Sequence, residues 1–71
     1  MALTSEIKQT ILQNSINEFE QRRFAATMSA AICKEVADNN GMEQAEKAAN
    51  DWLRRQNAAE KLLSALKTEP A

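Results

Sequence analysis

The clearest hydrophobic pattern lies in the second half of the chain, where a set of positions recurs at alternating spacings of three and four residues. This alternation is typical of a coiled-coil seam or of a helical hairpin. The seam comprises Met42, Ala45, Ala49, Trp52, Gln56, Ala59, Leu63 and Leu66. It predicts a helix over residues 42–67. Trp52 is expected to anchor the packing because several other seam positions are alanine, and Gln56 is expected at a solvated edge of the seam.

The first half of the chain carries two apolar stripes that do not share one helical face. The first stripe comprises Ile7, Ile11, Leu12, Ile16 and Phe19, and the second comprises Phe24, Met28, Ala31, Ile32 and Val36. At roughly 100° per residue the two stripes point to nearly opposite sides of an unbroken helix, with the switch at residues 20–23. Either the helix breaks near Arg22, or one long helix presents its two halves to different neighbours.

These patterns predict an all-α fold, because one glycine and one proline in 71 residues leave little material for turns or sheet corners. We expect a single domain over residues 1–71, a small helical hairpin or three-helix bundle with coiled-coil-like packing. The expected helical regions are about 5–38, with the break near 20–23 left open, and 42–67. The bend between them is expected at residues 39–41.

Asn39, Asn40 and Gly41 favour a bend because all three tolerate left-handed backbone angles. An alternative interpretation is the turn of a DNA-binding helix-turn-helix, since Ala37 stands four positions before Gly41. That motif calls for a short second helix with an aliphatic anchor near position 47, which is lysine here. The long seam that follows favours the hairpin.

The charged residues predict local ion pairs and no strong long-range field. Nine basic and ten acidic side chains give a net charge of −1, which does not favour nucleic acid or an anionic membrane as a partner. A patch formed by Arg22, Arg23, Arg54 and Arg55 is a candidate for binding an anion or an acidic partner. We favour the alternative that carboxylates four residues away neutralise it, Glu18 for Arg22 and Asp51 for Arg55, as Glu43 is expected to pair with Lys47.

Residues for catalysis or cofactor binding are scarce. The chain has no histidine and one cysteine, Cys33, so we expect no metal site, no disulfide within the chain, no cofactor and no enzymatic activity. Cys33 lies beside the second apolar stripe and is expected to act as a small hydrophobe. No run is long and apolar enough for a membrane span, no signal-peptide pattern is present, and a lone thiol fits a reducing compartment, so we expect a cytoplasmic protein.

The first stripe is the candidate partner or dimer interface. If the second stripe packs on the helix at 42–67, then Ile7, Ile11, Leu12, Ile16 and Phe19 face away and need a cover, either a third helix or another polypeptide. We therefore expect a non-enzymatic, self-associating protein-interaction module, such as an adaptor, inhibitor or chaperone. The alternatives are a small DNA-binding regulator and a structural subunit that assembles with itself.

Overall fold

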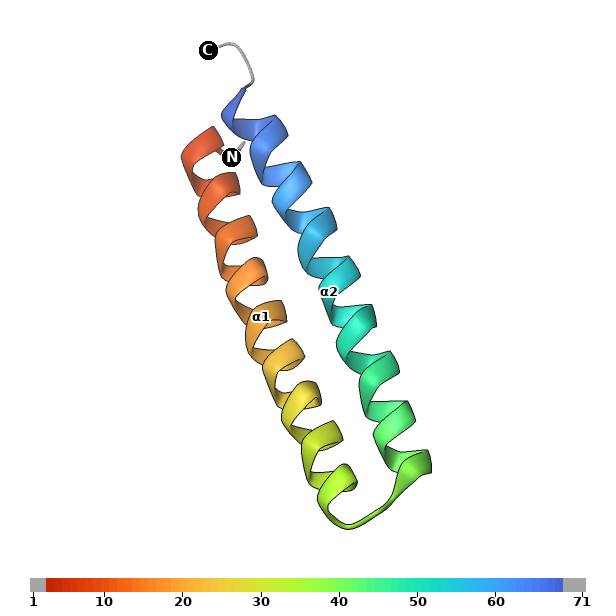
Figure 1. Ribbon diagram of the computed structural model, residues 1–71. Coiled ribbons are helices and arrows are strands. Elements are labelled where there is room, and N and C mark those ends of the chain that lie inside the picture. The colour runs from red at the N-terminus through yellow and green to blue at the C-terminus, as the bar shows by residue number, and fades with distance from the viewer. Residues whose placement is uncertain (1–2, 69–71) are drawn as a thin grey trace.

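Two long antiparallel helices make up the part of the chain that the computed structural model describes, residues 3–68 (Figure 1). Helix α1 spans Ser5–Glu35 and helix α2 spans Asn39–Lys67. They pack side by side into a rod of 54 × 16 × 15 Å. The predicted helical hairpin is therefore confirmed, whereas the three-helix alternative is wrong because the described residues form only two helices. Neither helix is apolar enough over a sufficient length to cross a membrane.

Helix α1 runs without a break through residues 20–23, where the sequence left a break open. Its N-cap is Thr4, whose Oγ1 accepts a hydrogen bond from the backbone N–H of Ile7 at 3.2 Å. The segment Glu20-Gln21-Arg22-Arg23 consists of good helix formers. The Glu18–Arg22 ion pair, at 2.8 Å, spans one helical turn there. A switch in side-chain pattern therefore occurs on a continuous backbone.

The turn lies at residues 36–38, three positions earlier than predicted. The N–H of Ala37 donates to the carbonyl of Lys34 at 3.1 Å, and the N–H of Asp38 donates to the carbonyl of Cys33 at 2.8 Å. This pair of bonds is the Schellman arrangement, which places the residue after the C-cap in the left-handed region. Ala37 takes that conformation, with φ of 58°. Asn39–Gly41, expected as the bend, instead form the first turn of α2.

Asp38 explains why α2 begins early. Its side chain caps the helix by accepting a hydrogen bond from the N–H of Gly41 at 2.9 Å. Aspartate is among the best N-cap residues because its carboxylate satisfies a backbone donor that has no partner in the helix. Gly41 does not have a positive φ angle. Glycine fits position 41 because it has no Cβ. A Cβ built there would lie 2.5 Å from Asp38 Oδ2.

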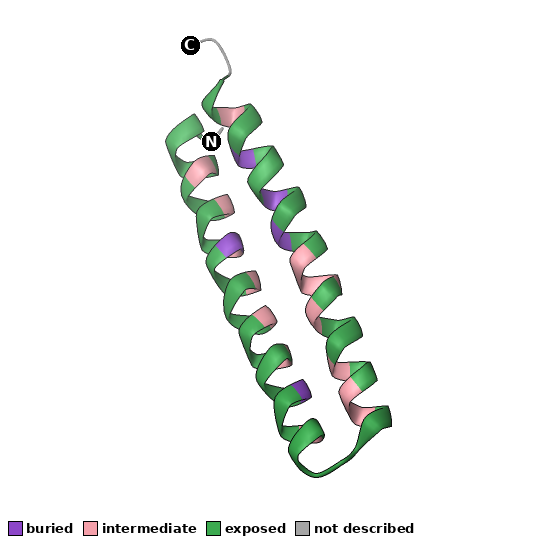
Figure 2. Cartoon of the chain, in the orientation of Figure 1, coloured by how far each residue is buried: buried purple, intermediate pink, exposed green. Residues whose placement is uncertain are grey.

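The core lies along one seam between the helices (Figure 2). On α2 the seam residues predicted from the sequence, from Met42 to Leu66, are all buried or half-buried. On α1 the facing positions also alternate by three and four: Gln9, Leu12, Ile16, Phe19, Arg23, Ala26, Ala30 and Cys33. Ile16, Ala59 and Leu63 form the buried cluster, with Leu12 and Phe19 packed against it. The apolar core is therefore concentrated toward the end of the rod that carries the termini.

The second stripe of α1 and three of the five residues of the first stripe face opposite to the expectation. Leu12, Ile16 and Phe19 of the first stripe lie between the helices, and Ile16 is only 5% exposed. The second stripe, expected to pack on α2, is largely exposed. The reason is that the α1 seam continues beyond Phe19 through an arginine and then small residues, whereas the large apolar side chains of this segment lie on the outer side. The sequence-based prediction of which side of α1 faces α2 was therefore wrong, because it followed the largest apolar side chains and not the heptad spacing.

Candidate interaction surface

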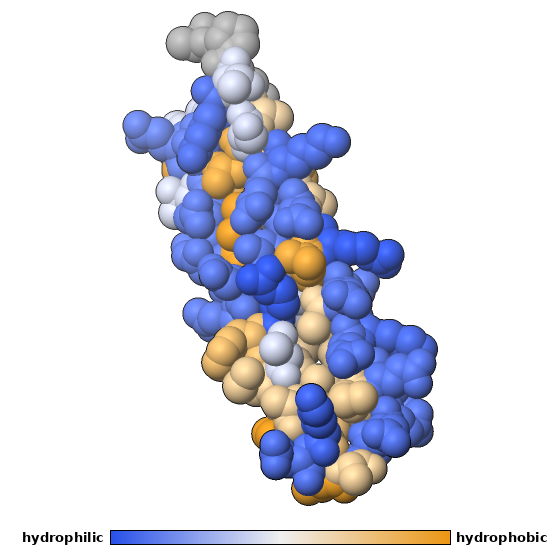
Figure 3. All heavy atoms as spheres, in the orientation of Figure 1, coloured by the Kyte–Doolittle hydropathy of each residue, from blue (hydrophilic) through white to orange (hydrophobic). Residues whose placement is uncertain are grey.

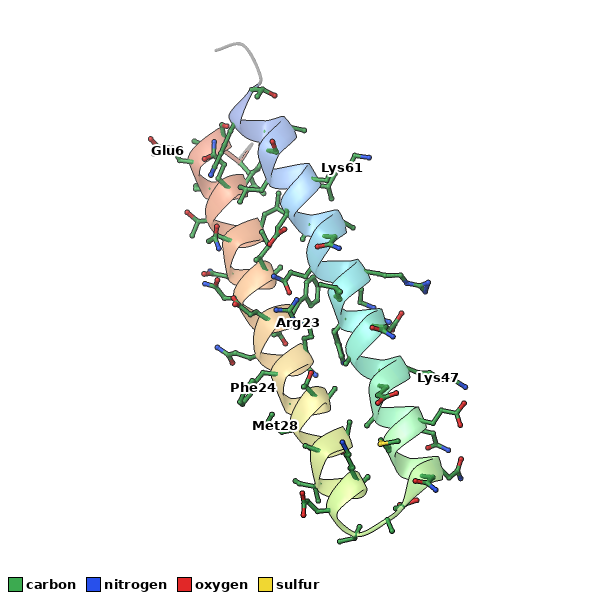
Figure 4. The ribbon with its side chains drawn as sticks, in the orientation of Figure 1. Glu6, Arg23, Phe24, Met28, Lys47 and Lys61 are labelled. Carbon is green, nitrogen blue, oxygen red and sulfur yellow. The ribbon has the colours of Figure 1, made fainter. Side chains whose placement is uncertain are left out.

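An apolar ridge, formed by Phe24, Met28, Ile32 and Val36, occupies the outer side of α1 near the turn. The exposed fractions of these residues are 64%, 42%, 65% and 70%, respectively. A spacing of four residues places neighbouring members one helical turn apart. Figure 4 shows Phe24 and Met28 pointing away from α2, and Figure 3 shows apolar atoms gathered over this half of α1. No described residue of the chain packs across this ridge as α2 packs across the seam.

A second exposed apolar set, the N-terminal patch, lies at the other end of the same side of α1. It comprises Leu3, Ile7 and Ile11, which are 53%, 46% and 50% exposed. Ile7 and Ile11 belong to the predicted interface stripe, so the structure divides that stripe. Leu12, Ile16 and Phe19 pack within the hairpin, while Ile7 and Ile11 remain at the surface.

Polar side chains separate the ridge from the N-terminal patch. Asn14, Asn17, Glu18 and Gln21 occupy the outer side of α1 between them, and all four are exposed. The outer side of α1 is thus apolar near both ends and polar in the middle. A solvated helix face would be polar along its whole length.

The outer side of α2 provides that comparison within the same molecule. It carries Glu43, Lys47, Asn50, Arg54, Asn57 and Lys61, all of them exposed. Lys47 and Lys61 extend from this side in Figure 4, and Lys47 pairs with Glu43 at 3.8 Å as predicted. The two helices are of similar length and share one seam, so their different outer sides are not explained by the packing of the hairpin.

The arginine patch is largely neutralised at its own helix surfaces. Both ion pairs expected from the sequence are present, Glu18–Arg22 at 2.8 Å and Asp51–Arg55 at 3.1 Å. Arg54 also approaches Asp51, at 3.7 Å. Arg23 lies apart from these pairs, half-buried at the α1 seam. The four arginines therefore do not present one open cluster of positive charge to an anion.

Trp52 lies at the centre of the arginine and aromatic contacts between the helices. Its ring centroid is 5.8 Å from that of Phe19, and the guanidinium carbons of Arg22 and Arg55 lie 5.1 and 4.7 Å from the Trp52 ring centroid. Arginine stacked on an aromatic face is favourable both through the ring quadrupole and through coverage of apolar surface. Two of the four arginines thus contribute to packing, a structural role that the sequence-based patch did not include.

Gln56 is buried in the seam and is not at a solvated edge. Only 8% of the residue is exposed, its Nε2 donates to Glu60 Oε1 at 3.2 Å, and its Oε1 has no partner in the described structure. A buried polar seam residue generally lowers stability, and in coiled coils it can select one register over others. The expectation of a solvated edge is therefore wrong.

The arrangement of the two helices differs from that of a DNA-binding helix-turn-helix. Such motifs set two helices at about 90–120° so that the second can enter the major groove. Here α1 and α2 lie side by side along their length (Figure 1), and Gly41 lies inside α2. No family model, curated protein or solved structure matches the chain, so the surface described above is interpreted from its own geometry.

Proposed function

We propose that the protein is a non-catalytic interaction module that binds a helix of another polypeptide chain through the outer side of α1. The observation that carries this proposal is the contrast between the two outer sides. Phe24 and Ile32 of α1 and Val36 at its C-cap are each at least 64% exposed. On α2 the exposed large apolar residue is Leu62, and charged and amide side chains line the side opposite the seam.

The proposed binding mode is helix packing. Side chains spaced four residues apart form a ridge that fits the groove of an amphipathic helix. Fully burying a large apolar side chain contributes about 1.5–3 kcal/mol, and roughly half of that remains to be gained at each position of the ridge. Adaptors, inhibitors and chaperones all use this mode, and the ridge alone does not select among them.

Site-specific photo-crosslinking tests the proposal. Benzoylphenylalanine incorporated in place of Phe24 is expected to crosslink to a defined protein in the cells that normally produce this chain. The same group in place of Asn50, on the outer side of α2, is the matched control and is expected to give no such product. Ile32→Glu should remove the Phe24 crosslink while leaving the helical circular dichroism signal intact. Equal crosslinking from both positions, or none from Phe24, would refute the proposal.

A further inference from the structure

We propose that the outer side of α1 binds a second copy of this chain, with the two α1 helices antiparallel and the twofold axis between Asn17 and Glu18. The inference rests on the proposed function and names its partner. It would make the assembly a layer of four helices, with the two α1 helices inside and the two α2 helices outside.

The size of the exposed surface supports a partner of this extent. A compact monomer of 7.9 kDa has an accessible surface of about 4,400 Å². This chain exposes 5549 Å², about 1,100 Å² more than that. Its radius of gyration is 16.2 Å, against about 11 Å for a compact domain of this length. A standard interface buries about 800 Å² on each partner, which the excess is large enough to supply.

The outer side of α1 is self-complementary in the antiparallel orientation. With the axis between residues 17 and 18, two positions face one another when their numbers sum to 35. Ile7 then lies opposite Met28, and Ile11 lies opposite Phe24. Leu3 precedes the extended N-cap residue Thr4, at about the level of Ile32. Ile7 and Ile11 of each chain thus cover Met28 and Phe24 of the partner's ridge, while Val36 falls beyond the end of the partner helix.

The polar middle is matched by the same register. Asn14 lies opposite Gln21, so two amides meet, and Asn17 lies opposite Glu18, which places an amide donor beside a carboxylate. All four side chains are exposed in the single chain, and Glu18 keeps its ion pair with Arg22. A single register therefore pairs apolar with apolar and polar with polar side chains along most of the helix.

The antiparallel orientation is favoured over the parallel one by electrostatics. Antiparallel neighbours place each positive helix end beside a negative one. A parallel pair would align the two dipoles. A shorter antiparallel register centred on Met28 would bury the ridge alone and leave the N-terminal patch exposed.

Disulfide trapping at the polar centre tests the register. In a Cys33→Ser background, Asn14→Cys and Gln21→Cys are made as separate proteins, oxidised singly and then as a mixture. In the proposed dimer, positions 14 and 21 face each other, whereas two copies of position 14 lie about 10 Å apart along the axis, too far for a disulfide. The mixture is therefore expected to form a crosslinked dimer rapidly, and each protein alone is not. Circular dichroism checks that both variants remain helical.

Other crosslinking patterns would overturn the inference. Crosslinking of each single-cysteine protein with itself would indicate a parallel pair, and self-crosslinking of Met28→Cys would indicate the shorter register. The unmodified chain is measured independently by sedimentation equilibrium, where twice the 7.9 kDa mass is expected at tens of micromolar. A monomer at millimolar concentration would also refute the dimer. If Phe24 still crosslinks to a different protein in cells, the proposed function survives that result.

Discussion

The effect of Gly41→Ala on the free energy of unfolding is expected to depend on the residue at position 38. The substitution should destabilise the protein when Asp38 is present and stabilise it when position 38 is alanine. A Cβ at Gly41 would lie 2.5 Å from Asp38 Oδ2, 2.9 Å from Asp38 Cγ and 3.0 Å from Cys33 Sγ. The Asp38 carboxylate must rotate away, and this breaks its hydrogen bond to the N–H of residue 41. Without that conflict, alanine would be preferred, because glycine is poor within a helix.

The two effects are similar in size, so their combination decides the outcome. Loss of an N-cap costs about 0.5–2 kcal/mol, while replacing glycine by alanine in a helix contributes about 0.5–1 kcal/mol. In the native background, Gly41→Ala should lower the free energy of unfolding by up to about 1 kcal/mol. In an Asp38→Ala background, where no carboxylate is displaced, the same substitution should raise it by about 0.5–1 kcal/mol.

Urea unfolding of the four proteins in this double-mutant cycle measures the coupling directly. Circular dichroism at fixed protein concentration provides the signal, since any self-association would make stability depend on concentration. Cys33→Ala in the same backgrounds controls for the sulfur contact. If Gly41→Ala is equally stabilising with and without Asp38, the cap and the close approach are both misassigned.

Four further substitutions test other parts of the hairpin by thermal or urea unfolding. Ala37→Gly should stabilise by about 0.5–1 kcal/mol, because Ala37 has a positive φ angle that glycine adopts without strain; no gain would argue against the Schellman turn. Gln56→Leu should stabilise by about 1–2 kcal/mol by removing a buried amide oxygen that lacks a partner, and a loss would indicate that this amide is satisfied. Trp52→Ala should cost about 2–4 kcal/mol and Trp52→Phe clearly less, because a half-buried ring loses area and stacking; equal losses would refute the stacked cluster. Ile16→Ser should unfold the hairpin while Ile11→Ser leaves its helicity intact, since Ile16 is 5% and Ile11 50% exposed; the reverse order would place Ile11 in the seam and Ile16 at the surface.

The sequence was most informative where the relevant interactions are local. The Glu18–Arg22, Glu43–Lys47 and Asp51–Arg55 pairs follow from a spacing of four residues on a helix. The end of α2 at Lys67 followed from a heptad seam that ends in large residues, whereas its start lies three residues before the predicted one. Such features depend only on neighbours within one or two turns, so one amino-acid sequence is enough to predict them.

The phase of α1 was harder to predict because the packing partner sets it. Ala26, Ala30 and Cys33 continue the heptad of Leu12, Ile16 and Phe19, but small side chains give a weak hydrophobic signal. Arg23 interrupts the pattern further. The large apolar residues of this segment lie on the outer side, where burial within one chain does not require them. Following the heptad through its small members would have found the seam and identified the ridge as surface.

The sequence-based prediction placed the turn three residues too late because two local preferences compete. Asn39, Asn40 and Gly41 all tolerate left-handed backbone angles, whereas alanine, the residue at position 37, adopts them at an energetic cost. The Asp38 cap to Gly41 fixes the start of α2 and leaves Ala37 to close the turn. The available signal was the strong preference of aspartate for the N-cap position of a helix. At Asp38 this preference outweighs the tendency of the asparagine-glycine segment to form a bend.

The uneven seam also has a kinetic consequence. Near the turn the seam is built largely from alanines, while the buried cluster joins Ile16 to Ala59 and Leu63 at the opposite end. A hairpin can close near its turn at little entropic cost, but the packing that forms first is then the weakest. Most of the apolar surface becomes buried only when segments more than 40 residues apart in the sequence come into contact. Folding is therefore expected to be all-or-none. Its transition state is expected to form only after the long chain segment between Ile16 and Ala59 has closed into a loop.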